Sequence, residues 1–126
     1  MFAIRLLPPS ELGGDGERLG QITVGRFSER FACYPIGDNS VRSMPARWRK
    51  ELRRLVEGEE QAVALVYDPR FAWIIYRVGR RCCIQQKFSL NENFTDISPR
   101  RTHTDDGQLI SEWYTTLAEI TYYIEA

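Results

Sequence analysis

The 126-residue sequence has little of the side-chain chemistry on which most enzymes and metal sites depend. It contains one histidine, His103, and three cysteines, and none of them occurs in a CxxC or HxxxH metal-binding spacing. The phosphate-binding patterns GxxxxGK[ST] and GxGxxG are also missing, and the glycines at 13–16 lack the following helix that such a loop requires. A Cys–His nucleophile pair is conceivable, but the cysteines lie in apparent strands and His103 lies in a polar loop. We therefore expect no enzyme activity, no metal site and no cofactor.

The sequence also has no long apolar run and no excess of one charge. No apolar stretch approaches the ~18 residues of a membrane-spanning helix, and residues 1–9 end at two prolines and do not resemble a signal peptide. The 17 basic and 17 acidic residues balance, whereas a general nucleic-acid binder usually carries a basic excess. These absences predict a cytosolic protein with reduced cysteines, no membrane contact and no nucleic-acid partner.

The residues that are present predict one α+β domain spanning residues 1–126. Hydrophobic residues make up 43% of the chain, which is enough for one core. Apolar or alternating segments predict strands over 2–7, 19–34 (bent or divided near Gly25), 61–67, 71–78 and 81–88, and a final strand or extended segment over 108–115. Because no βαβ alternation occurs, we expect a mostly antiparallel sheet with one longer helix at about 43–57 and a short one at about 117–124.

The longer helix is amphipathic and basic. Ser43 can cap its start, and Gly58 ends it. Its apolar stripe comprises Met44, Trp48, Leu52 and Leu55. Arginines and one lysine cover the rest, and Glu51 can pair with Arg47 and Arg54. The basic segment 47–54 allows an alternative function, a nucleic-acid or regulatory binding module. Trp48 and Leu52 in this segment belong to the apolar stripe, however, which favours an ordinary amphipathic helix with a solvated polar face.

Several segments together resemble the immunity proteins of bacterial contact-dependent growth inhibition systems. The resemblance begins with the stretch 20–31, in which Phe-x-Glu-x-Phe follows a second glycine, and continues with Ser40 eight residues before Trp48. The helix end 55–59 and the segments 73–77 and 83–86 are similar to the family's helix and central hairpin. The segments 99–102, 105–107 and 110–113, with a terminal helix, look like its C-terminal signature. The chain departs from the family's usual residues at Arg26 and Arg47.

The resemblance implies a cytosolic antidote that catalyses nothing. Such a protein would bind, one to one, the toxic C-terminal domain of a large secreted effector, often a nuclease, and block its active site or substrate access. An inhibitor of this kind needs a complementary interface with aromatic or arginine anchors and matched charges. Against a nuclease, carboxylates would stand where phosphates bind.

We expect the toxin contacts in the long polar loop at 89–107 and its flanks, because loops carry function while strands and the helix stripe pack the core. The candidate residues are Glu92, Asp96, Arg100, Asp105, Asp106 and Glu112. The three tryptophans, Trp48, Trp73 and Trp113, are expected in the core rather than in the interface.

Overall fold

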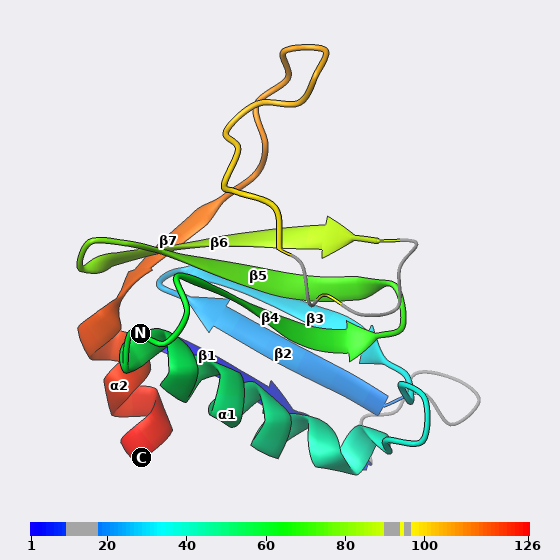
Figure 1. Ribbon diagram of the computed structural model, residues 1–126. Helices are drawn as coiled ribbons and strands as arrows, with labels where there is room; N and C mark the ends of the chain where they lie inside the picture. The colour runs from blue at the N-terminus through cyan, green and yellow to red at the C-terminus, as the bar shows by residue number, and fades with distance from the viewer. Residues whose placement is uncertain (10–17, 90–93, 95–96) are drawn as a thin grey trace.

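The computed structural model describes residues 1–9, 18–89, 94 and 97–126, and within them the chain forms two antiparallel sheets and two helices (Figure 1). The first sheet has the order β1-β2-β3 and the second the order β4-β5-β6-β7. The strands are β1 (Phe2–Leu6), β2 (Arg18–Val24), β3 (Phe27–Cys33), β4 (Ala62–Asp68), β5 (Phe71–Val78), β6 (Arg81–Phe88) and β7 (Trp113–Thr116). The helices are α1 (Met44–Val56), preceded by a 3-10 turn (Val41–Ser43), and α2 (Leu117–Glu125). The predicted α+β class and antiparallel pairing are confirmed.

The first sheet is a meander whose predicted division near Gly25 is confirmed, because β2 and β3 form a hairpin around it. Gly20 in β2 lies opposite Phe31 in β3. A Cβ atom built on Gly20 would lie 2.5 Å from the Phe31 ring. Only glycine at this position therefore lets the ring lie across the sheet and reach the core.

The core lies where the two sheets meet α1 and α2. The predicted stripe of α1 is buried in full, with Met44, Trp48, Leu52 and Leu55 at most 1% exposed. Trp48 also donates a hydrogen bond from its indole N–H to the carbonyl of Val66, at 2.8 Å. This bond helps to hold α1 in its place beside β4 (Figure 1).

The tryptophans pack in or against the core, as predicted, and Trp73 and Trp113 also join the two sheets. Trp73 is fully buried, and its ring lies 5.9 Å from the ring of Phe31 in the first sheet. Trp113 is partly buried against the same core and stacks on Phe27 with ring centroids 4.0 Å apart. The indole N–H of Trp73 has no hydrogen-bond partner within the described residues.

The ends of the helices differ in how well the sequence predicted them. Gly58, with φ of 82°, ends α1 as expected: its N–H bonds the carbonyl of Leu55, and the next N–H bonds that of Arg54. Ser43 does not cap the start, because its hydroxyl donates to the carbonyl of Ser40 instead. That cap prediction is wrong because the preceding 3-10 turn already engages Ser43.

Candidate functional site

A two-stranded extension projects from the second sheet between β6 and β7. We call it the finger and define it as residues 99–111. The N–H of Thr104 donates to the carbonyl of Gln108 at 2.8 Å, and the N–H of Ile110 donates to that of Thr102 at 2.9 Å. The finger stands away from the rest of the molecule in Figure 1, and every residue from 101 to 109 is exposed. Its own backbone pairing therefore holds it in shape while its side chains face solvent.

An ion pair fixes the base of the finger to the second sheet. The guanidinium of Arg100 donates two hydrogen bonds to the carboxylate of Glu112, one of them at 2.7 Å from Nε to Oε2. The Glu112 side chain is 5% exposed. The hydrogen bond from Arg100, aided by one from Gln85, lowers the pKa of Glu112 to about 2 against the opposing effect of burial. Glu112 is therefore ionised at neutral pH and keeps Arg100 in place.

Gln85 completes this clamp from β6. Its side chain is fully buried, and its Nε2 donates to Glu112 Oε2 at 2.8 Å and to the carbonyl of Arg101 at 2.9 Å. Its Oε1 has no hydrogen-bond partner within the described residues. Gln85 was not among the residues predicted for the site. The sequence did contain a signal for it: Gln85 is a polar residue two positions after Cys83, so its side chain lies on the same buried face of β6.

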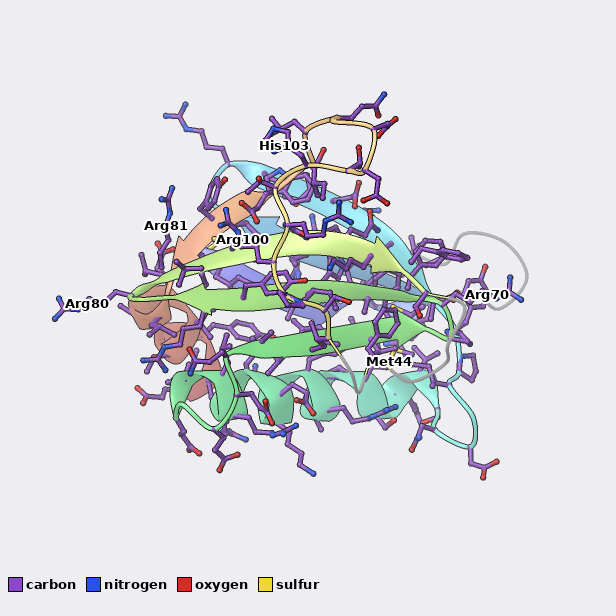
Figure 2. The ribbon with its side chains drawn as sticks, turned by 45° about the horizontal axis from the view of Figure 1, so that its top comes forward. Met44, Arg70, Arg80, Arg81, Arg100 and His103 are labelled. Carbon is purple, nitrogen blue, oxygen red and sulfur yellow. The ribbon has the colours of Figure 1, made fainter. Side chains whose placement is uncertain are left out.

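The outer end of the finger carries acidic groups that are open to solvent. Asp105 has a side chain that is 96% exposed, and it pairs with Arg101 at 2.7 Å. Asp106 accepts a hydrogen bond from the Thr104 hydroxyl. The single histidine, His103, is exposed on the same part of the chain, and Figure 2 shows it farther from the sheet than Arg100. Exposed ion pairs contribute little to stability, so these carboxylates can exchange partners at small cost.

The structure thus divides the predicted contact residues. Asp105 and Asp106 lie together at the exposed end of the finger. Arg100 and Glu112 lie at its base and bind each other. Glu92 and Asp96 lie outside the described residues.

Helix α1 carries the basic segment of the alternative, nucleic-acid-binding function. Some of its arginines make contacts within the molecule. Arg49 donates to the carbonyls of Tyr123 and Ile124 at the end of α2, both at 3.1 Å. Arg54 pairs with Glu51 and Glu60, each at 2.9 Å. The carboxylates beside Arg54 reduce the positive potential that a recognition helix would present to phosphates, and Arg49 is held against the end of α2.

The cysteines are unsuited to nucleophilic chemistry. All three are free and buried. Burial raises the pKa of Cys33 to about 12 and that of Cys82 to about 11, so neither forms the reactive thiolate near neutral pH. In the described ranges, no group of three or more His, Cys, Asp or Glu side chains is arranged to hold a metal ion.

Comparison with known proteins decides the family. The family model described as the CdiI N-terminal domain matches residues 35–123, well over half of the chain. The chain belongs to this family. A comparison with curated proteins finds no match.

A solved structure shares the fold of this CdiI-family chain. It is a chain of the CdiA-CT/CdiI toxin and immunity complex from Enterobacter cloacae, with a TM-score of 0.79 and 22% sequence identity. The match covers 99% of the present chain and 97% of the other. The family model begins after β3, but the structural likeness includes the first sheet, which therefore belongs to the shared fold.

Family membership confirms the resemblance to contact-dependent growth inhibition immunity proteins. The matched residues contain α1, the finger and the clamp of Arg100 with Glu112, so the candidate site lies inside the matched segment. None of the helices described for this CdiI-family chain has the length and apolar character needed to cross a bilayer.

Proposed function

We propose that this chain is a cytosolic, non-catalytic immunity protein that binds one toxic C-terminal domain of its cognate CdiA effector and neutralises it. The observation that carries the proposal is the match to the CdiI N-terminal domain over residues 35–123. The site supports it on physical grounds. The finger offers an ordered, exposed projection for docking, and the buried cysteines offer no nucleophile.

The toxin we propose is a nuclease. Asp105 and Asp106 place two carboxylates at the exposed end of the finger. A nuclease binds phosphates with cationic side chains, and the same side chains would attract these carboxylates and speed capture. The finger would then exclude the substrate by occupying or bordering the phosphate-binding surface.

The function is tested by co-expressing this chain with the C-terminal domain of the CdiA effector encoded beside its gene. We expect the two proteins to copurify, and we expect this chain to restore growth to cells that make the toxin. A toxin domain that stops growth but neither binds this chain nor is neutralised by it would refute the assignment for that pair.

The acidic end of the finger has its own test. The double variant Asp105→Lys/Asp106→Lys should weaken toxin binding by roughly tenfold or more, because two attractive charges become repulsive ones. The exposed ion pair lost with Asp105 is worth little to the fold, so thermal unfolding should hardly change. Calorimetric titration with the toxin domain measures the affinity.

A matched control for this variant is Asp38→Lys/Glu125→Lys. Both residues are exposed and lie outside the finger, and the change in net charge is the same. If the two double variants bound the toxin equally well, the end of the finger would not be part of the interface.

A further inference from the structure

A groove of about 1000 Å³ lies along β4 and reaches residues 76–78 at the end of β5. Arg47 and Glu51 of α1 line one side of it, and residues 97–100, at the base of the finger, line the other. The side chains of Ala62 and Ala64 lie between these walls. Because these two side chains are small, the backbone of β4 lies close to the interior of the groove.

The register of the second sheet shows which backbone groups of β4 face away from β5. The carbonyl of Gln61 accepts the N–H of Arg77 at 2.8 Å, so Gln61 belongs to a hydrogen-bonded pair. In an antiparallel ladder such pairs alternate. The N–H and C=O groups of Ala62, Ala64 and Val66 therefore point away from β5.

These outward groups are only partly used. The carbonyl of Val66 accepts the indole N–H of Trp48. Within the described residues, no hydrogen bond reaches the outward N–H or C=O of Ala62 or Ala64. Ala62 and Ala64, two alternate residues of β4, thus each offer one donor and one acceptor. Their spacing is the one with which an added strand forms hydrogen bonds.

α1 lies beside β4 and Trp48 bonds the outward carbonyl of Val66, but the part of β4 from Ala62 to Ala64 has, in its own sequence, none of the protective features that other edges have. Folded proteins discourage strand addition with short edge strands, charged side chains, proline or bulges. β7, at the other edge, has four residues, and β3 in the first sheet carries Glu29 and Arg30. From Ala62 to Tyr67, β4 has no charge and no proline, and its register shift comes only after Val66.

The charges on the walls indicate what kind of segment fits. Arg54 pairs with Glu51 and Glu60 at 2.9 Å and with Glu59 at 3.6 Å, so this cluster of side chains keeps an excess of negative charge. Arg47 faces the groove and has no hydrogen bond or ion pair to any described residue. A carboxylate on the occupant would match Arg47.

We propose that an extended segment of the toxin domain pairs with the free edge of β4, an inference that rests on the proposed function. The segment adds a fifth strand to the second sheet by bonding the outward groups of Ala62 and Ala64. It places small apolar side chains over these alanines and a carboxylate beside Arg47. Main-chain pairing supplies affinity, and the groove and Arg47 supply specificity.

Amide hydrogen exchange, followed by NMR on the full chain with and without the toxin domain, tests the pairing directly. The amides of Ala62 and Ala64 should exchange quickly in the free protein and at least about tenfold more slowly in the complex. The amides of Val63 and Leu65 already bond β5, so they should be protected in both states. A complex that forms without new protection at Ala62 and Ala64 overturns this inference but leaves the immunity function intact. Failure of any complex to form refutes the function itself, and the inference with it.

A proline at residue 62 tests the same bond by removing its donor. Ala62→Pro deletes an N–H that points away from β5, so the ladder to β5 is kept. The control Ala62→Val has a side chain of similar size and keeps the N–H. We expect Ala62→Pro to bind the toxin at least about tenfold more weakly than Ala62→Val, with both proteins folded by circular dichroism. Equal affinities would overturn the inference.

The carboxylate is tested by Arg47→Ala, with Lys50→Ala as its control. Lys50 is an exposed cation of α1 that does not line the groove. Arg47→Ala should weaken toxin binding about fivefold or more and reduce its dependence on salt, whereas Lys50→Ala should do neither. The same affinity and salt dependence in both variants would rule out an acidic group beside Arg47.

Discussion

Arginine side chains hold several parts of the backbone together. The guanidinium of Arg77 donates to the carbonyls of Leu55 and Val56, at 3.0 and 3.3 Å, where α1 ends. Arg49 does the same at the end of α2. A planar group with several donors can bond two neighbouring carbonyls at once and carries positive charge to the negative end of the helix dipole. The strong preference for arginine over lysine, 15 against two, therefore has a structural use in this fold.

The clamp at the base of the finger gives a prediction about pH. Glu112→Gln should lower the free energy of unfolding by about 2 kcal/mol at pH 7, because a buried, charge-assisted pair with Arg100 is lost. The folded-state pKa of about 2 lies below the usual value for glutamate. The stability that Glu112 contributes is thus complete above pH ~4.3 and is lost as the pH falls through about 2. Urea unfolding of both proteins from pH 7 down to pH ~2 should show their difference shrinking only in the acid range.

Glu57→Gln is the control for this measurement, since Glu57 is exposed and its side chain has no partner among the described residues. Its effect should stay within about 0.5 kcal/mol at every pH. A difference between wild type and Glu112→Gln that did not vary with pH would show that the ionised pair is not what stabilises the base.

Among the elements, the C-terminal end of α1 and the β5–β6 hairpin were predictable, while the segment after β6 was not. Gly58 ended α1 as expected, and β5 and β6 turn at 79–80 as expected, because glycine there adopts a positive φ, 82° and 67°. Of the strand or extended segment predicted over 108–115, only the end belongs to a strand of the sheet, β7 (Trp113–Thr116). Residues 108–110 instead pair back onto 102–104 within the finger. Alternation in the sequence indicated an extended backbone but could not identify the strand that it pairs with.

The contact between the two sheets gives a second prediction, at the scale of elements. Trp113 of β7 stacks on Phe27 of β3 and lies edge-on to Trp73, with ring centroids 6.1 Å apart. Trp113→Ala should lower the free energy of unfolding by about 2–4 kcal/mol, because it removes a large, partly buried ring between the sheets. Chemical denaturation followed by far-UV circular dichroism measures the change.

Tyr122→Ala provides the comparison, since Tyr122 is an aromatic residue that is 78% exposed. Its effect should stay within about 0.5 kcal/mol. If Trp113→Ala were equally mild while toxin binding fell, Trp113 would belong to the interface rather than to the core.

The whole molecule has no net charge, and this gives a prediction about nucleic acid. α1 retains exposed cations at Lys50 and Arg53, but Arg49 and Arg54 are engaged within the fold. We expect no measurable binding of labelled RNA or DNA by fluorescence anisotropy at about 150 mM salt. A nucleic-acid affinity that fell steeply between about 50 and 200 mM salt would instead favour the basic-helix alternative.

The finger and the β4 groove adjoin each other on the same side of the second sheet. Pro99 and Arg100 belong to the base of the finger and also line the groove. One partner could therefore contact Asp105 and Asp106 with one part of its surface and the edge of β4 with another. The clamp by Glu112 would then fix the distance between the two contacts.

The sequence by itself determined the local features of this protein. Periodicity, turn glycines and apolar spacing gave the α+β class, both helices and the buried stripe of α1, because these depend on neighbours a few residues apart. The order of its motifs gave the family. Only the tertiary structure decided which candidate residues are free to meet a partner. Arg100 and Glu112 are 12 positions apart, and the carboxylate of Glu112 also accepts a hydrogen bond from Gln85 in another strand. The open edge of β4 likewise follows from strand order and register, which result from pairing between distant segments.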